Sequence, residues 1–320
     1  MKKILVIGGG AMGSAFTIPC IENNNRVTIT EPYSKIFIRN LSSKNKFHSA
    51  LKIKLPKKLK FRKFSKDLLN EKFDLIVIAL SLSGIDFIGK YFKNLRIKTP
   101  ILVLTKGLKY EKKYTKIFTI SEQLQKKFGI KNISVLKGPC LAKELARKNQ
   151  TSVVIANRNI TFAKRIGKII STNYYLTEFS NDIIGIEVCS AIKNIYSMII
   201  GAGQSFNASS NLFQKSIIEM KYLVRYFKGK EETIFGLAGV GDLYVSAAGG
   251  RNSKMGSYLG KGFTFKTAKK RFMPKDTVEG EQLAREIAPY IFKKINNKKI
   301  PLMINLLKTI KENKKLTIKV

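Results

Sequence analysis

The sequence predicts an α/β chain in which a doubly wound, mostly parallel sheet is followed by an all-α domain. In the first half, short apolar runs alternate with helix-like segments, the order of parallel strands joined by crossover helices. From residue 181 onward the periodic segments are helix-like. The 320 residues are enough for two domains. We therefore expect a sheet domain at 1–182 and an α-helical domain at 183–320.

The first elements begin almost at the N-terminus. Segment 2–31 contains an apolar run, a glycine cluster, a helix-like pattern, an Asn-rich turn and a second apolar run that ends in Glu31, which is the order of a βαβ unit. Further strand-like runs lie at 73–80, 100–105, 133–138 and 151–157, and helix-like segments of the second half lie at 182–203, 211–228, 279–295 and 301–313.

The charge of the chain is strongly positive. Lys and Arg number 60 against 21 Asp and Glu, a net charge of +39. Such an excess favours polyanionic partners through phosphate contacts. It is spread over both halves, however, and the chain is also rich in Ile and Asn. We therefore favour compositional drift over nucleic-acid binding, and an anionic substrate fits either interpretation.

Cysteine and histidine usage excludes several kinds of chemistry. Cys20, Cys140 and Cys189 are far apart and form no CxxC pair, so neither a disulfide framework nor a metal site is indicated. The only histidine, His48, lies in a Lys-rich segment that reads as a solvated loop. A His-dependent mechanism would depend on that one residue, and we do not expect one.

The sequence does not predict a membrane span. The most apolar helix-like run, 184–203, carries Glu187, Lys193 and Asn194, so it offers no uncharged stretch of about 18 residues. The N-terminal Lys-Lys and apolar run are followed at once by glycines, without the longer apolar region of a signal peptide. We therefore expect a cytoplasmic protein.

The glycine cluster fits the pattern G-x-G-x-x-G at Gly8, Gly10 and Gly13, with Ala11 and Met12 between the last two. It follows a predicted strand and opens a predicted helix. In that setting the glycines allow a tight turn, close approach of the backbone to a pyrophosphate and close helix–strand packing, while the helix N-terminus offers N–H groups to the anion. We predict a Rossmann-type dinucleotide-binding domain.

Glu31 ends the second strand and is the expected ribose-binding acid. A carboxylate there accepts hydrogen bonds from ribose hydroxyls and repels a 2′-phosphate, which slightly favours NAD(H) over NADP(H). Nearby Lys35 and Arg39 offer an alternative contact to a 2′-phosphate, and the alternative interpretation of Glu31 is a solvated loop acid.

Eight blocks occur in an order and spacing that resemble the bacterial NAD(P)-dependent sn-glycerol-3-phosphate dehydrogenases, over essentially the whole chain. The blocks are "GGGAMGSA" (8–15), "TKGL" (105–108), "GPCLAKELA" (138–146), "IGIEVCSAIKNIYSMIIGAG" (184–203), "NASSNLFQKSIIEM" (207–220), "GLAGVGDLYVS" (236–246), "RNSKMG" (251–256) and "VEGEQLA" (278–284).

The resemblance implies a role for each matching residue. Lys193 matches the catalytic lysine that exchanges a proton with the substrate C2 oxygen. Lys106 matches a contact to both substrate and cofactor. The other implied substrate contacts are Gly138, Cys140, Asp242, Gly250, Arg251 and Asn252, and the other implied cofactor contacts are Ala142, Arg251 and Glu279.

Elementary chemistry agrees with a lysine in that role. Hydride reduction of a ketone needs a proton for the developing alkoxide and a cation to stabilise it. A lysine supplies both if desolvation and a second ammonium lower its pKa, and the resemblance brings Lys106 close to Lys193. Asp242 would orient the lysine or bind a substrate hydroxyl, and Arg251 with Asn252 would hold the phosphate.

Each residue also has a purely structural interpretation that involves no catalytic or binding role. A lone lysine in an apolar run can snorkel from a helix edge, "GVGDL" can be an Asx-capped turn, and "RN" beside glycines can be a solvated loop. Lys143 and Glu144 read as surface residues at a helix start. The joint order of the blocks is what favours the functional interpretation.

Four departures from the family pattern stand out. Cys140 replaces a usual Thr, and Gly250 replaces a usual Ser, so two hydroxyl donors to the substrate are lost. Leu80-Ser81-Leu82 stands where the family carries a Pro-Ser-His-like segment, and the usual arginine after the second strand is missing. The first two changes bear on substrate affinity and the last two on cofactor choice.

We thus expect an oxidoreductase that interconverts dihydroxyacetone phosphate and sn-glycerol 3-phosphate with NAD(P)H and, by resemblance, feeds phospholipid synthesis. The alternatives are another two-domain dehydrogenase acting on a small hydroxy or sugar acid, and a non-catalytic dinucleotide- or polyanion-binding protein. For partners we expect a small phosphorylated substrate, no nucleic acid and no membrane span. A homodimer is a candidate assembly that the sequence leaves open.

Overall fold

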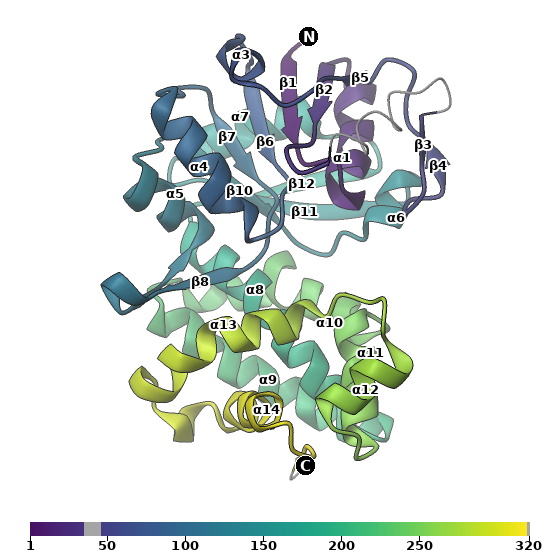
Figure 1. Cartoon of the computed structure of the whole chain (residues 1–320), viewed down its shortest axis with the longest axis vertical. Helices are drawn as coiled ribbons and strands as arrows, with labels where there is room; N and C mark the ends of the chain where they lie inside the picture. The colour runs from purple at the N-terminus through teal and green to yellow at the C-terminus, as the bar shows by residue number, and fades with distance from the viewer. Residues whose placement is uncertain (35–45, 319–320) are drawn as a thin grey trace. The chain divides into compact units, whose positions relative to one another are not determined.

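The computed structural model describes residues 1–34 and 46–318, which form two compact units (Figure 1). Met1–Lys106 and Ile120–Ile183 make up the first, here called the sheet unit. Gly107–Thr119 and the described residues from Ile184 onward make up the second, here called the helical unit. Segment 107–119 groups with the helical unit, which the sequence did not indicate, and the division into domains at residue 182 stays a prediction.

An eight-stranded sheet forms the centre of the sheet unit, in the order β12-β11-β10-β7-β6-β1-β2-β5. Its strands are β1 (Lys3–Ile7), β2 (Arg26–Thr30), β5 (Lys60–Phe61), β6 (Leu75–Ile78), β7 (Ile101–Val103), β10 (Ile133–Lys137), β11 (Thr151–Ala156) and β12 (Tyr175–Ser180). All neighbouring pairs are parallel except β10 with β11. The predicted mostly parallel, doubly wound sheet is confirmed, and β5 and β12 are strands that the sequence did not predict.

The order of the strands reverses direction between β6 and β1. From β1 the chain moves outward to β2, whereas from β6 it moves the other way through β7 to β10. Because parallel crossovers are right-handed, the intervening helices lie on opposite faces: α1 (Ala11–Glu22) on one, α4 (Gly84–Asn94) and α5 (Ile120–Phe128) on the other. The carboxyl ends of β1 and β6 are therefore the switch point where such sheets bind ligands.

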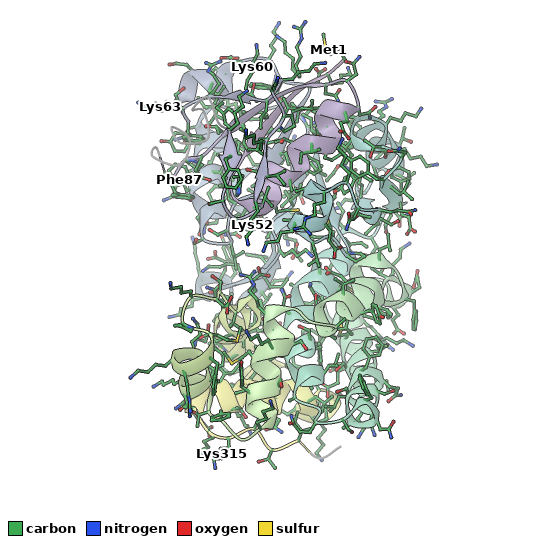
Figure 2. The ribbon with its side chains drawn as sticks, turned by 90° about the vertical axis from the view of Figure 1, so that its right-hand side faces the viewer. Met1, Lys52, Lys60, Lys63, Phe87 and Lys315 are labelled. Atoms are coloured by element: carbon green, nitrogen blue, oxygen red, sulfur yellow. The ribbon has the colours of Figure 1, made fainter. Side chains whose placement is uncertain are left out.

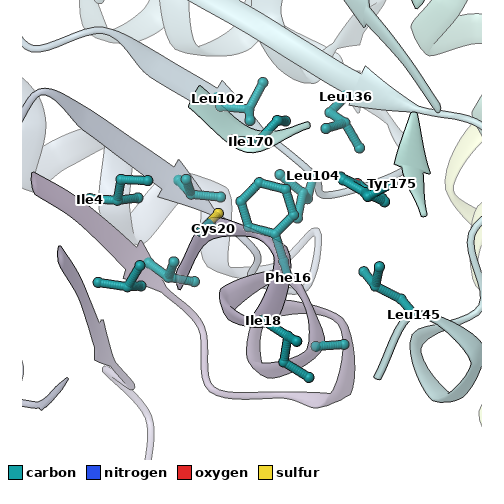
Figure 3. Close-up of a cluster of buried hydrophobic side chains, with 14 of the residues drawn as sticks. Ile4, Phe16, Ile18, Cys20, Leu102, Leu104, Leu136, Leu145, Ile170 and Tyr175 are labelled. Carbon is teal, nitrogen blue, oxygen red and sulfur yellow. The ribbon is translucent and has the colours of Figure 1, made fainter. Parts of the chain in front are cut away.

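The core between α1 and the sheet is apolar and closed. Figure 3 shows Phe16 and Cys20 of α1 among side chains from the strands, with Tyr175 beside them. The rings of Phe16 and Tyr175 meet edge to face with centroids 6.1 Å apart. Burial raises the pKa of the Cys20 thiol, which therefore remains an inert core residue. The packing holds α1, and with it the loop that precedes α1, in a fixed position.

The helical unit consists of seven α-helices over its described residues, with short 3-10 and π turns between some of them. They are α8 (Ile183–Gly201), α9 (Phe206–Tyr226), α10 (Asp242–Ala247), α11 (Arg251–Gly260), α12 (Phe265–Phe272), α13 (Glu279–Lys294) and α14 (Pro301–Glu312). The predicted helices at 182–203, 211–228, 279–295 and 301–313 are confirmed. The short helices α10 to α12 were not predicted, because glycines and polar residues interrupt their apolar spacing.

A β-hairpin from the first half of the chain packs on α13 within the helical unit. Strands β8 (Leu108–Glu111) and β9 (Lys116–Thr119) pair antiparallel. Glu286 of α13 accepts a hydrogen bond from the Tyr110 N–H at 3.0 Å, and the Lys109 ammonium lies 3.3 Å from the same carboxylate. The hairpin begins two residues after Lys106 in the sequence, and its contacts with Glu286 hold it to the helical unit.

Helix α8 is long and apolar enough to cross a membrane by length and composition, yet 94% of its apolar window is buried inside the protein. This is the behaviour of a core helix. Its neighbour α11 approaches very closely, because Gly256 leaves no room for a side chain against the carbonyl oxygen of Met198 on α8. The two helices that carry Lys193 and Asn252 are thereby held backbone to backbone.

Basic side chains project from the surface of both units (Figure 2). The labelled Lys52, Lys60 and Lys63 belong to the sheet unit and Lys315 to the helical unit, and all four are exposed. The positive charge is thus distributed over both units, as the sequence indicated.

Glu219 of α9 fastens the N-terminus of α14. Its carboxylate accepts hydrogen bonds from the Leu302 N–H at 2.7 Å, the Met303 N–H at 3.1 Å and the Tyr196 hydroxyl at 3.0 Å. These N–H groups have no carbonyl partner within their own helix, so the carboxylate takes the place of a cap. Burial nevertheless raises the pKa of Glu219 above its ordinary value.

This raised pKa predicts a pH dependence of stability. The folded protein holds the Glu219 proton more tightly than the unfolded chain does, so the contribution of this group is complete below the unfolded pKa and is lost as pH rises through the folded pKa. We expect the free energy of unfolding of wild type to fall relative to that of Glu219→Gln as pH rises above the ordinary carboxyl pKa of 4.5 and through the raised pKa of Glu219. Urea unfolding at stepped pH measures the difference, and a constant or opposite trend would contradict the expectation.

Candidate active site

The glycine loop lies at the switch point, between β1 and α1. Gly8 has φ of 118°, and a side chain on it would meet the backbone of Ala79 at the end of β6. A side chain on Gly13 would overlap the Gly8 carbonyl oxygen, whereas one on Gly10 would enter open space. Gly8 and Gly13 therefore shape the loop, and Gly10 leaves its outer side open to a ligand. These are the features that a pyrophosphate site needs.

Helix α1 begins at Ala11 with Gly10 as its N-cap, and no side chain caps it. The first N–H groups of a helix lack intrahelical partners and carry the positive end of the helix dipole. Ala11 and Met12, both half-buried, lie in this first turn. The residues present thus fit the phosphate groups of a dinucleotide.

Glu31 lies next to the glycine loop. One carboxylate oxygen accepts the Gly9 N–H at 2.8 Å and the other accepts the Tyr33 N–H at 3.0 Å. A carboxylate has about four acceptor positions, so a ribose hydroxyl can still bind to it. The alternative phosphate contacts Lys35 and Arg39 lie outside the described residues.

His48 is not in a solvated loop, and that expectation was wrong. It is 2% exposed, its Nε2 lies 3.2 Å from the Gly9 carbonyl oxygen, and its Nδ1 accepts the Leu51 N–H at 3.3 Å. The surrounding segment forms a small hairpin of β3 (Phe47–His48) and β4 (Ile53–Lys54). Its leucines are core residues spaced four apart, namely Leu51, Leu55 and Leu59.

Lys106 and Gly138 meet where β7 and β10 end. The Lys106 ammonium donates to the Gly138 carbonyl oxygen at 3.4 Å. Lys137, at the end of β10, reaches to the end of β7. It is 2% exposed, and its ammonium donates to the carbonyl oxygens of Val103 and Thr105 at 3.1 and 2.6 Å. Two lysines therefore bind the two strand ends together at the edge where the glycine loop also lies.

Cys140 and Ala142 follow Gly138 on this edge. Cys140 is partly buried, and Ala142 is the half-buried first residue of α6 (Ala142–Ala146). Lys143 and Glu144 are exposed, as expected of surface residues at a helix start.

In the helical unit, Lys193 is buried in the middle of α8 and faces α10. Its ammonium lies 2.7 Å from Oδ1 of Asp242, and the two side chains are 8% and 4% exposed. It also donates to the hydroxyl of Ser246, one turn further along α10. The snorkelling interpretation of Lys193 is therefore wrong, because the ammonium ends on a buried carboxylate and not in solvent.

A second group of polar side chains surrounds the neighbouring residue of α8, Asn194. Its amide oxygen accepts from Asn252 at 3.1 Å, and its amide nitrogen donates to Glu279 at 3.4 Å. Glu279 also pairs with Arg251 at 3.2 Å, and Asn252 accepts the Gly280 N–H at 2.9 Å. Three helices, α8, α11 and α13, are joined at this point.

Gly250 is the N-cap of α11, and it comes close to α10. A side chain on it would come within 2.7 Å of the Ser246 carbonyl oxygen. The serine that is usual in the family therefore does not fit this backbone without a shift. Ser246 itself contacts Lys193, so α10 carries a hydroxyl of its own to this site.

The structure gathers the predicted residues into three sets. The glycine loop with Glu31 and the strand-end set of Lys106, Gly138, Cys140 and Ala142 belong to the sheet unit. Lys193, Asp242, Gly250, Arg251, Asn252 and Glu279 belong to the helical unit. The proximity of Lys106 to Lys193 stays a prediction. Sequence reasoning missed Ser246, Asn194, Lys137 and His48.

Among the described residues no group of three or more His, Cys, Asp and Glu side chains could hold a metal ion.

A parallel sheet with an open glycine loop at its switch point, followed by helices that bury a lysine–aspartate pair, defines a two-domain dinucleotide-dependent dehydrogenase. The N-terminal family model of the NAD-dependent glycerol-3-phosphate dehydrogenases matches residues 3–163, and the C-terminal model matches residues 182–319. The chain belongs to this family.

Relatives and solved structures agree with that assignment. The chain is 30% identical over 281 residues to NADP(+)-dependent glycerol-3-phosphate dehydrogenase of Archaeoglobus fulgidus, covering 83% of this chain and 82% of the relative. It is 30% identical over 318 residues to glycerol-3-phosphate dehydrogenase [NAD(P)+] of Francisella tularensis, covering 94% and 91%. The crystal structure of glycerol-3-phosphate dehydrogenase from Coxiella burnetii superposes with a TM-score of 0.84 at 25% identity, over 98% of this chain and 96% of that one.

Proposed function

We propose that this protein interconverts dihydroxyacetone phosphate and sn-glycerol 3-phosphate with NAD(H) or NADP(H), and that Lys193 is its general acid and base. The observation that carries the proposal is the buried pair of Lys193 and Asp242 in a chain whose two halves both match the family. The runner-up, a dehydrogenase for another small hydroxy or sugar acid, has no observation in its favour.

The buried pair supports this chemistry directly. The dinucleotide, when bound, exchanges a hydride with the substrate carbon. Lys193 then gives a proton to the substrate oxygen in reduction and takes it back in oxidation. Asp242 and Ser246 fix the ammonium from α10, and its positive charge would stabilise a developing alkoxide.

The other residues would bind the two ends of the reactants. Arg251 and Asn252 supply N–H donors for the substrate phosphate, and Lys106, Gly138 and Cys140 supply further contacts. Asn252 uses its amide oxygen and one N–H within the protein, which leaves Arg251 as the principal phosphate ligand. Ala142, Arg251 and Glu279 would contact the dinucleotide together with the glycine loop and Glu31.

The experiment is NADH oxidation by the purified protein with dihydroxyacetone phosphate, run beside a panel of small keto acids and sugar acids. We expect turnover with dihydroxyacetone phosphate alone. Cofactor binding without turnover on any substrate would favour a non-catalytic dinucleotide-binding protein, and turnover on another acid would favour the runner-up.

The same assay with NADPH gives a prediction about Glu31. Because its carboxylate is held against the glycine loop, it repels a 2′-phosphate, and we expect a lower KM for NADH than for NADPH. Glu31→Gln removes the negative charge, so the ratio of the KM for NADPH to the KM for NADH should fall by about tenfold. A strong preference of wild type for NADPH would contradict this role.

We further propose that the protein works in the cytoplasm, where its product would supply phospholipid synthesis, and that it needs neither nucleic acid nor membrane as a partner. A homodimer is the assembly we propose to test by light scattering.

A further inference from the structure

Gly9, the middle glycine of the loop, is held from three sides. Glu31 accepts its N–H at 2.8 Å, whereas its carbonyl oxygen receives the Ser14 hydroxyl at 2.8 Å and lies 3.2 Å from Nε2 of His48. Ser14 and His48 are buried. The carbonyl of Gly9 is thus fixed in direction by two buried donors, of which Ser14 lies in α1 and His48 in a separate hairpin.

The hydrogen bonds determine the tautomer of His48. Nδ1 faces the Leu51 N–H at 3.3 Å, a donor that it shares with the His48 carbonyl oxygen at 3.2 Å, so Nδ1 carries no proton. Nε2 therefore carries the proton of the neutral ring and donates it to Gly9. The ring is also held by its hairpin, since Lys52 donates its N–H to the His48 carbonyl oxygen at 2.8 Å and Leu51 is fully buried in the core.

The direction of the Gly9 carbonyl has a consequence for its neighbour. The described peptide bonds are all trans, and across a trans peptide the C=O and the following N–H point in opposite directions. When His48 and Ser14 hold the Gly9 carbonyl inward, the Gly10 N–H is turned to the opposite side. Gly10 is exposed and its outer side is open. An N–H in that position is available to an anionic group of a dinucleotide.

We propose that His48 is a positioning residue for dinucleotide binding, which holds the Gly9 carbonyl through its Nε2–H and so presents the Gly10 N–H to the phosphates of the cofactor. The inference rests on the proposed function only in taking the ligand to be NAD(H) or NADP(H). Preorganisation of this kind improves affinity because the loop does not have to be ordered during binding.

Two substitutions separate the contacts of the ring. In His48→Gln the amide nitrogen reaches the place of Nε2 and can still donate to Gly9. In His48→Asn the amide reaches only the place of Nδ1, so it can accept from Leu51 but cannot reach Gly9. The Asn variant therefore loses the proposed contact while keeping the hairpin contact, and the Gln variant does the reverse.

We expect the Kd of NADH, measured by titration calorimetry without substrate, to rise about fivefold to tenfold in His48→Asn and to stay within about twofold of wild type in His48→Gln. The KM for dihydroxyacetone phosphate and the kcat at saturating NADH should be unchanged in both. In the cofactor-free protein, amide hydrogen exchange at Gly10 should be altered in the Asn variant only.

Equal Kd values for the two variants, or a loss of thermal stability in His48→Asn without a change in Kd, would overturn the positioning role. A wild-type protein that binds NADH but turns over no substrate would remove the proposed function and leave the role of His48 standing. A wild-type protein that binds neither NADH nor NADPH would overturn both.

Discussion

Lys193→Met is expected to lower kcat by a factor of about 10² to 10⁴, the usual contribution of a general acid and base. The side chain keeps its apolar stem within α8 but loses the proton that the substrate oxygen needs. The Kd of NADH should change little, because Lys193 is not among the proposed contacts of the dinucleotide, whereas the glycine loop and Glu31 are. Stopped-flow measurement of NADH oxidation with dihydroxyacetone phosphate, together with calorimetric NADH binding, separates the two effects.

The substitution also leaves the carboxylate of Asp242 buried without its partner at 2.7 Å. Breaking a buried pair in this way costs about 3 to 5 kcal/mol of stability. The double variant Lys193→Met/Asp242→Asn removes that charge, so it should recover much of the stability but none of the activity. Its activity decides whether the loss in the single variant was chemical.

Two further variants complete the comparison. Lys193→Arg retains a cation that stays protonated, so it can stabilise an alkoxide but cannot supply the proton, and its kcat should remain far below wild type. Lys270→Met removes an exposed lysine of α12 and should behave as wild type. A folded Lys193→Met protein with near-normal turnover would contradict the role proposed for this lysine.

The sequence predicted the sheet and the long helices because both rest on periodic apolar residues. The runs that became β1, β6 and β10 are almost wholly buried, and burial on both faces leaves a continuous apolar run. The hairpin at 108–119 was not predicted. Its polar residues contact Glu286, which lies 176 positions beyond Tyr110 in the chain, and no local pattern indicates a partner at that separation.

The candidate site was predicted in part, and for a similar reason. Lys193, Asp242 and Arg251 were identified because each lies in a short motif that can be recognised from the residues next to it in the sequence. His48 was misread because the lysines around it resemble a loop, while the core residues of the segment, Leu51, Leu55 and Leu59, are few. Ser246 and Asn194 were missed because their hydrogen-bond partners are distant in the sequence. Ser246 accepts from Lys193, and Asn194 accepts from Asn252, only in the folded helical unit.

The second large effect is expected from Gly256→Ala in α11. Alanine normally stabilises a helix relative to glycine by about 0.5 to 1 kcal/mol. Here the added methyl would overlap the Met198 carbonyl oxygen of α8, and both sides of the contact are backbone, so neither can move without shifting a helix. We expect a loss of about 1 to 3 kcal/mol in the free energy of unfolding, opposite in sign to the helix propensity.

The shift would also reach the site. Separation of α11 from α8 lengthens the 3.1 Å contact of Asn252 with Asn194, so the KM for dihydroxyacetone phosphate should rise in Gly256→Ala. Gly249→Ala is the matched control, because a side chain there meets nothing within 4 Å, and it should leave stability within about 0.5 kcal/mol of wild type. Urea unfolding and steady-state kinetics of both variants test the argument. If Gly256→Ala is as stable as Gly249→Ala, the close contact between α8 and α11 does not position the substrate-binding residues.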